Sequence, residues 1–159
     1  MGFARYTNLC GRPTYLTHPA YPTYGPTALT RPAMIIDCHG HYTTAPKALQ
    51  AYRDAQLAAL QGPSAGPRSK GTVAIADDEI RESLEGAQLK LQRARGTDVT
   101  IFSPRASAMA HHIGDETTSL HWSEHCNDLI ARVCTLYPKN FVGVCQLPQS
   151  PGVPPARSI

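Results

Sequence analysis

Three short apolar runs alternate with helical patterns, and this order restricts the chain to few folds. The runs are MIIDCH (residues 34–39), DVTIFSP (98–104) and FVGVCQLP (141–148). Their β-branched and aromatic residues predict buried strands. Strands that alternate with helices are typical of right-handed βαβ units, so the sequence predicts an α/β protein with a parallel sheet.

The segments between these runs carry helical signals. Residues 46–61 predict one helix, and a second is predicted from Asp77 or Asp78, as its cap, to Gly96, where it stops. The apolar positions that we expect on the buried face of this second helix are Ile80, Leu84, Ala87 and Leu91. A third helix is predicted over residues 122–137, where apolar side chains recur at a spacing of 3.6.

Two histidines, His39 and His41, finish the first run with one glycine between them. Side chains alternate along a strand, so both imidazoles would point to the same side, with Cα atoms roughly 6.6 Å apart. Imidazoles at that separation can ligate one zinc ion, and Gly40 would leave space for other ligands or a substrate. The alternative is that both side chains simply finish the strand, hydrogen-bonded or in contact with water.

The residues around this pair resemble a known family. IIDCHGHY is similar to the first-strand metal motif of the amidohydrolase superfamily. Residues 77–109, which end in TIFSPRASAM, and residues 126–151 resemble the 4-oxalomesaconate hydratases, in the branch that includes the aminocarboxymuconate semialdehyde decarboxylases. The resemblance implies the N-terminal part of a (β/α)8 TIM-type barrel, with about three strands and flanking helices.

The resemblance also implies a reaction. Members of this group are hydro-lyases that add water to the double bond of 4-oxalomesaconate in protocatechuate and gallate 4,5-cleavage catabolism. His39 and His41 would be ligands to Zn²⁺ or another divalent metal, which makes water more reactive near neutral pH. A related decarboxylase that acts on an unsaturated carboxylic acid is the alternative.

A polycarboxylate substrate of this kind requires cationic groups that bind it. Arg105, in the loop after the second run, is the candidate, because a guanidinium can hold a carboxylate through two hydrogen bonds. Ser103 and Ser107 could add hydroxyl hydrogen bonds, and His112 could reach the same pocket. The alternative for Arg105 is a solvated loop position.

The resemblance covers only part of a barrel. A complete (β/α)8 barrel takes about 250 residues, and the third metal ligand and the catalytic acid are expected beyond residue 159. No catalytic residue is therefore assigned. We expect a truncated chain that is inactive alone, or a non-catalytic fragment, whose open sheet edges predict a risk of aggregation. A homo-oligomer is a separate expectation.

The ends of the chain differ from its middle. Residues 1–33 hold five prolines, four tyrosines and the whole net charge of +3, so a disordered leader is predicted, followed by a partial barrel over 34–150 and an aberrant tail over 151–159. The remaining residues carry 12 basic and 12 acidic side chains, which argues against a nucleic-acid partner.

The apolar runs and the cysteines of the sequence predict the compartment of the protein and the redox state of its thiols. No apolar run approaches the roughly 20 residues of a membrane span, and no signal peptide is evident, so a cytoplasmic location is expected. The five cysteines are odd in number and form no C-x-x-C pair, which predicts reduced thiols.

A second metal motif competes with the first. HWSEH, residues 121–125, fits the inverted zinc-protease pattern H-x-x-E-H. It falls at the first turn of a helix whose apolar stripe is used for packing, with no further ligand or cleft evident, and it is the less favoured site.

Overall fold

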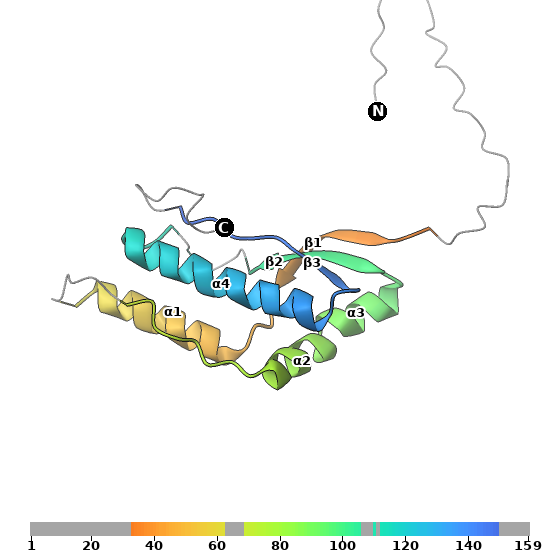
Figure 1. The fold of residues 1–159 in the computed structure, drawn as a ribbon, viewed down its shortest axis with the longest axis horizontal. Helices are drawn as coiled ribbons and strands as arrows, with labels where there is room; N and C mark the ends of the chain where they lie inside the picture. Colours follow the sequence, from red (N-terminus) through yellow and green to blue (C-terminus); the bar gives the residue numbers. More distant parts are fainter. Residues whose placement is uncertain (1–32, 63–68, 106–109, 111, 150–159) are drawn as a thin grey trace, which may run out of the picture. The chain divides into compact units, whose positions relative to one another are not determined.

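The structure, a computed structural model, describes residues 33–62, 69–105, 110 and 112–149. The elements are β1 (Ile36–Tyr42), α1 (Lys47–Leu60), α2 (Asp77–Gly86), α3 (Gln88–Arg95), β2 (Val99–Pro104), α4 (Glu116–Leu136) and β3 (Phe141–Gly143) (Figure 1). They lie within one compact unit, Met34–Ile159. The predicted leader, the predicted tail and Ser107 fall outside the described residues, so the domain boundaries remain predictions.

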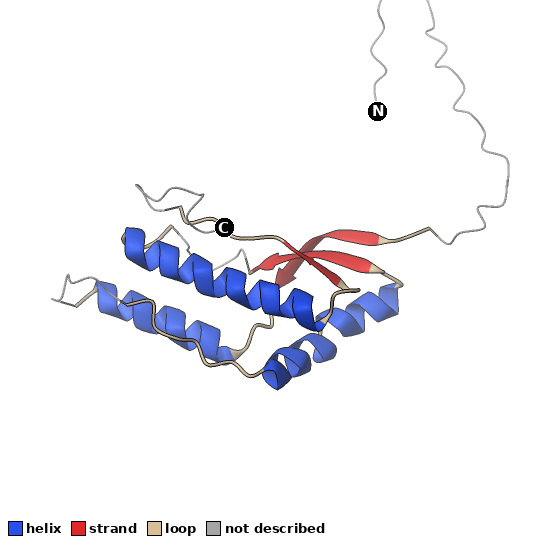
Figure 2. Cartoon of the chain, viewed as in Figure 1, coloured by secondary structure: helices blue, strands red, loops and turns tan. Residues whose placement is uncertain are grey.

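The three strands form one sheet in the order β1-β2-β3, and both pairs are parallel. The chain returns from β1 to β2 through α1, α2 and α3, and from β2 to β3 through α4. Figure 2 shows the helices on one side of the strands. This arrangement confirms the α/β class and the strand–helix order predicted from the sequence.

The core lies between the sheet and the helices. Phe102 on β2 is fully buried, and its ring lies 4.6 Å from that of Phe141 and 5.5 Å from that of Tyr42, centroid to centroid. The predicted third helix is confirmed as α4, whose buried side chains include Trp122, Cys126, Leu129, Ile130 and Val133. These residues hold α4 against β2 and β3.

The prediction of buried strands is wrong for part of β1 and β3. Ile35 and Ile36 are 51% and 54% exposed, and Val142 is 55% exposed. The reason is that helices cover only one face of the sheet in the described part of the chain. β1 and β3 are also its two edge strands.

The second predicted helix is in fact two helices. Ala87 has φ −131° and ψ −86°, which interrupts the helix between α2 and α3. Leu89 is therefore fully buried, and Leu91, predicted on the buried face, is 51% exposed. The predicted face holds for Ile80 and Leu84, before the interruption.

Of the two predicted ends of this helical region, the N-terminal one is wrong and the C-terminal one is confirmed. The N-cap is Ala76 instead of Asp77 or Asp78, and its backbone N–H donates to Oε2 of Glu79 at 2.8 Å. Gly96 closes α3 with φ +66°, a left-handed conformation that glycine adopts without a steric penalty, so the predicted stop is confirmed.

Two further observations bear on the chain's environment. None of the helices within the described segments has the length and apolar character that a membrane span requires. Cys38, Cys126, Cys134 and Cys145 are free thiols, as expected for the described cysteines.

Candidate metal centre

His39 and His41 lie near the carboxyl end of β1, and their imidazoles are neighbours. The ring centroids are 4.9 Å apart and the ring planes meet at 85°. His39 is exposed and His41 is half-buried. The backbone N–H of His39 donates to Oδ1 of Asp37 at 3.0 Å, where the β1–β2 ladder is irregular. The structure therefore brings the two predicted ligands together.

Ser103, the neighbour of His41 on β2, fixes the imidazole orientation. Its Oγ lies 2.7 Å from Nδ1 of His41, and the same hydroxyl donates to the carbonyls of Gly40, at 3.2 Å, and Pro104, at 3.3 Å. A hydroxyl has a single hydrogen, so when that hydrogen points to a carbonyl, Oγ accepts from Nδ1–H. The lone pair of His41 is then on Nε2, where it can ligate a metal.

Gly40 serves packing between the strands and leaves no room for a ligand. A Cβ at this position would lie 2.2 Å from Cγ2 of Thr100 and 2.9 Å from the carbonyl oxygen of Ile101. Both atoms belong to β2. The expectation that Gly40 makes space for a substrate or for further ligands is therefore wrong, because its open side faces the neighbouring strand.

Gln88, at the start of α3, holds the chain that follows the histidines. Its Nε2 donates to Oγ1 of Thr43 at 3.3 Å and to the carbonyl of His41 at 3.5 Å, while its Oε1 accepts from Oγ1 of Thr44 at 2.8 Å. These bonds are possible because the helix is interrupted at Ala87. The interruption thus ties the end of β1 to the helical layer.

The donor set fits part of a divalent-metal site. Two neutral imidazoles are ordinary zinc ligands, and one of them is already oriented by a hydroxyl. Catalytic zinc generally takes three protein ligands. Within the described ranges, no group of three or more His, Cys, Asp or Glu side chains could hold a metal ion. The described residues therefore offer two candidate ligands, one of them in contact with a hydroxyl.

Arg105 follows β2 and lines a pocket that does not include the imidazoles. It is exposed, and it lines a pocket of about 180 Å³ together with Tyr42 and Pro104. His41 pairs with Ser103, and Tyr42 pairs with Pro104. Successive side chains alternate between faces, and Tyr42 packs into the helix-covered core at 1% exposure. The pocket is therefore on the helix side.

The other two predicted substrate-binding residues are His112 and Ser107. His112 is exposed, in the turn that precedes α4, and Ser107 lies outside the described residues. Ser103 contacts a histidine of the pair.

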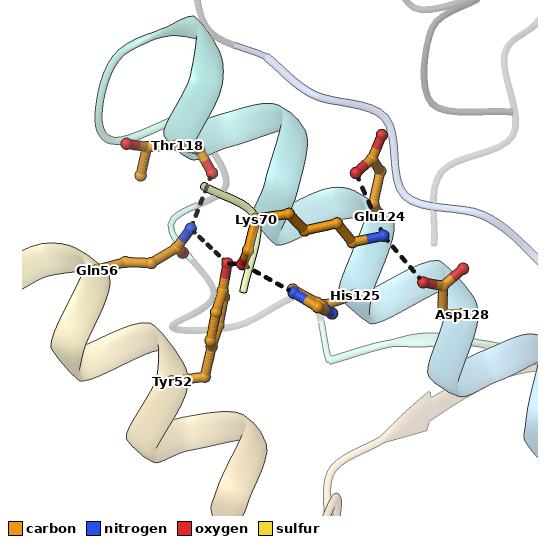
Figure 3. A network of polar contacts seen from close by, with 7 residues as sticks. All are labelled: Tyr52, Gln56, Lys70, Thr118, Glu124, His125 and Asp128. Carbon is orange, nitrogen blue, oxygen red and sulfur yellow. Dashed lines mark hydrogen bonds and ion pairs between the residues drawn. The ribbon is translucent and has the colours of Figure 1, made fainter. Parts of the chain in front are cut away.

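The competing H-x-x-E-H site is occupied by a structural network (Figure 3). Nζ of Lys70 pairs with Glu124 at 3.3 Å and with Asp128 at 3.1 Å. The carbonyl of Lys70 accepts from the hydroxyl of Tyr52 at 2.7 Å and lies 3.3 Å from Nε2 of His125. Burial lowers the pKa of His125. Glu124 and His125 thus connect the segment at Lys70 to α4, so this less favoured motif makes structural contacts.

Comparison with known proteins places this geometry in a family. The model described as Amidohydrolase matches residues 36–159. The chain belongs to the amidohydrolase family. As in its relatives, the three parallel strands and their helices form the N-terminal part of an amidohydrolase barrel, which confirms the resemblance seen in the sequence.

Two relatives of this amidohydrolase are hydratases. The chain is 54% identical over 126 residues to the 2-keto-4-carboxy-3-hexenedioate hydratase of Sphingobium sp. (strain NBRC 103272 / SYK-6), covering 79% of this chain and 36% of that protein. It is 51% identical to the crystal structure of 4-oxalomesaconate hydratase, LigJ, from Rhodopseudomonas palustris, with a TM-score of 0.67, covering 77% of this chain and 36% of the other. The amidohydrolase chain spans about a third of the length of each.

A third similarity is too distant to support an argument. The crystal structure of 2,6-dihydroxybenzoate decarboxylase complexed with 2,6-dihydroxybenzoate is 20% identical, with a TM-score of 0.41.

Sequence reasoning missed two residues of this amidohydrolase that matter locally. Arg53, on α1, is 2% exposed, and its ring-stacked guanidinium lies 5.0 Å from the centroid of Trp122. The sequence carried one signal for the burial of Arg53, its position four residues after Leu49 on the same helical face. Gln88 gave no signal, because the helix interruption that exposes it to β1 is not evident from spacing.

Proposed function

We propose that residues 34–149 supply the first-strand part of the metal centre of a hydratase that adds water to the carbon–carbon double bond of 4-oxalomesaconate. The observation that carries this proposal is the pair of neighbouring imidazoles, with His41 oriented by Ser103 at 2.7 Å. The identity of 51% and 54% to two hydratases supports the reaction class.

In this proposal His39 and His41 would hold a divalent cation, with zinc as the first choice for imidazole ligands. The cation supplies Lewis acidity, which makes water a stronger nucleophile near neutral pH. Ser103 keeps Nδ1 of His41 protonated and its Nε2 available. Arg105 is not assigned to this site, because it lines a pocket that does not include His39 or His41, and its role in substrate binding remains a prediction from the sequence.

The number of candidate ligands in this chain determines the zinc affinity and the activity that we expect. Since the described residues offer two ligands, and catalytic zinc generally takes three, we expect the 159-residue chain alone to bind zinc weakly and to show no turnover. A cytoplasmic location and a homo-oligomer remain predictions from the sequence.

The test is a chimera. Residues 34–149 of this chain replace the matching segment of the Sphingobium hydratase, which is 54% identical to this chain over 126 residues. Zinc content and the loss of the 4-oxalomesaconate absorbance are then measured. We expect the chimera to bind zinc and to hydrate the substrate, and we expect His39→Ala and His41→Ala to lose both properties.

Controls separate the alternatives. His121→Ala changes a histidine of α4 outside the imidazole pair and should leave zinc content and rate unchanged. A folded, zinc-loaded chimera without hydratase activity would refute the proposed reaction. Zinc retained at full stoichiometry in the His39→Ala/His41→Ala variant would refute the proposed ligands, and the chain would then be a non-catalytic relative.

A further inference from the structure

A pocket of about 180 Å³ lies on the helix side of the sheet, between α1 and α4. Apolar side chains that line it include Leu49, Leu129 and Ile130, and Thr43 and Arg105, which directly follow β1 and β2, also line it. Because Tyr42 and Pro104 face this side and His41 and Ser103 face the other, the pocket is separate from the imidazole pair.

The charged groups of the pocket are all of one sign. Lys47, Arg53 and Arg105 are the ionisable cations among the described residues that line it, and no carboxylate is among those lining residues. Arg53 is buried, and its Nη atoms donate to the carbonyl of Ala110 at 2.6 Å and to Oε1 of Gln56 at 3.1 Å. These partners are neutral, so the buried guanidinium has no compensating negative charge among the described residues.

Two buried donors of the pocket lack acceptors. Nε of Arg53 and Nε1 of Trp122 are buried and make no hydrogen bond within the described part of the chain. Both residues line the pocket, and both are 2% exposed. Buried N–H groups are almost always paired, so two unpaired donors at one pocket indicate a missing acceptor. A negatively charged acceptor would also compensate Arg53.

The N-terminus of α1 also favours a negatively charged ligand in this pocket. Its N-cap, Pro46, makes no side-chain capping bond, and its first turn contains no acidic residue. The partial positive charge of this helix end is therefore not neutralised locally, and Pro46 and Lys47 both line the pocket. The helix end, the buried donors and the cations all favour an anion.

We propose that this pocket binds a small organic carboxylate with a compact apolar body. The carboxylate would be the acceptor that Arg53 and Trp122 lack, Lys47 and Arg105 would add positive charge, and the apolar body would lie against Leu49 and Leu129. The site goes beyond the proposed hydratase function, because it is on the opposite side of the sheet from the imidazoles. The volume suits a single ring, since an apolar cavity of about 150 Å³ takes benzene.

The experiment titrates benzoate into the ¹⁵N-labelled 159-residue protein without metal and follows amide shifts by NMR. We expect saturable shifts at residues of α1 and α4. Benzyl alcohol, which has the ring without the charge, and inorganic phosphate, which has the charge without the ring, should each bind at least about tenfold more weakly. A charge-assisted hydrogen bond is worth about 1.5–3 kcal/mol, or roughly 10-fold or more in affinity.

Exposed cations provide variants that leave the fold intact. Lys47→Gln and Arg105→Gln should each weaken benzoate binding by about three- to tenfold, the lower figure reflecting solvent exposure. Lys139→Gln makes the same charge change away from the pocket and should have no effect. Equal weakening by all three variants, or equal affinity for benzoate and benzyl alcohol, would overturn the proposal.

One more variant separates this site from the metal centre. His39→Ala/His41→Ala should lose zinc and keep its benzoate affinity. If benzoate binding is lost with the imidazoles, the carboxylate site is at the metal centre, and the second site is refuted while the hydratase proposal stands. If benzoate binding survives and the chimera does not hydrate its substrate, the hydratase proposal alone fails.

Discussion

Nδ1 of His41 and Oγ of Ser103 lie 2.7 Å apart on neighbouring strands. If the hydroxyl hydrogen points to the carbonyl of Gly40 or Pro104, Oγ accepts from Nδ1–H of His41. Ser103, which sequence reasoning assigned to substrate binding, thus contacts a candidate metal ligand.

The tautomer of His41 is directly measurable in the metal-free protein. We expect the neutral imidazole to carry its proton on Nδ1, which long-range ¹H–¹⁵N correlation spectra of the ring resolve. Ser103→Ala should remove this preference and lower zinc affinity by about 10- to 100-fold, the usual cost of losing such a partner. Ser103→Thr keeps a hydroxyl and should restore most of it. A proton on Nε2 of His41 in the unaltered protein would contradict the assignment.

Gly40 is expected to be intolerant of a methyl group. Gly40→Ala places a Cβ 2.2 Å from Cγ2 of Thr100, so β1 must move away from β2, and we expect a loss of about 1–3 kcal/mol in the free energy of unfolding. Gly86→Ala is the matched control, because no atom lies within 4 Å of its Cβ, and a helical glycine replaced by alanine gains up to about 1 kcal/mol. Urea unfolding measures both changes. Equal stability of the two variants would show that the strands do not approach as described.

The cysteines should differ sharply in reactivity. Cys126 is 1% exposed and burial raises the pKa of its thiol, whereas Cys145 is exposed. The thiolate is the reactive form, so iodoacetamide should label Cys145 well before Cys126 in the folded protein. Mass spectrometry of the peptides gives both rates, and labelling in urea should equalise them. Rapid labelling of Cys126 under native conditions would argue against its place in the core.

Stability should fall on mild acidification because of His125. Burial lowers the pKa of this imidazole in the folded protein, with the nearby Lys70 carbonyl acting in the opposite direction. The unfolded chain takes up a proton near pH 6.5, the ordinary imidazole value, while the folded protein does so only at lower pH. The contribution of neutral His125 is therefore complete above about pH 6.5 and is lost as the pH falls through the folded pKa.

Urea midpoints between about pH 7.5 and pH 5.5 test this prediction, in a range where carboxylates contribute little. His125→Gln should flatten the dependence. Lys139→Gln removes an exposed charge that does not influence the pKa of His125, and it should leave the slope unchanged. If His125→Gln retains the full slope, another group is responsible.

The sequence predicted most of the fold because its signals were local. Pro46, Gly96 and Pro138 end helices or begin them by their own backbone restrictions, and the apolar stripe of α4 requires a sheet to cover it. The interruption at Ala87 was missed although Gly86, the last residue of α2, precedes it, because an isolated glycine within a helical pattern is often tolerated. Its cause lies in tertiary contacts, through Gln88 to β1, and local patterns carry no information about those.

The site was predictable only in part for the same reason. The spacing of His39 and His41 implies adjacency, since one strand carries both. The partner of His41 comes from another strand, 62 residues later, and Gly40 is needed because of the neighbouring strand. The uncompensated charge of Arg53 also becomes visible only when its surroundings are known, because an arginine at helical spacing from Leu49 could equally face solvent.

The interruption between α2 and α3 has one further consequence. Gln88 bridges the carbonyl of His41 and the hydroxyls of Thr43 and Thr44. A substitution on the outer surface that straightened these helices into one would rotate this amide away from β1 and release the turn behind the imidazoles. Mutations that improve helix propensity near Ala87 would then raise local stability and disturb the orientation of His39 and His41. Directed evolution for stability alone would therefore select against the proposed binding of a metal ion by these imidazoles.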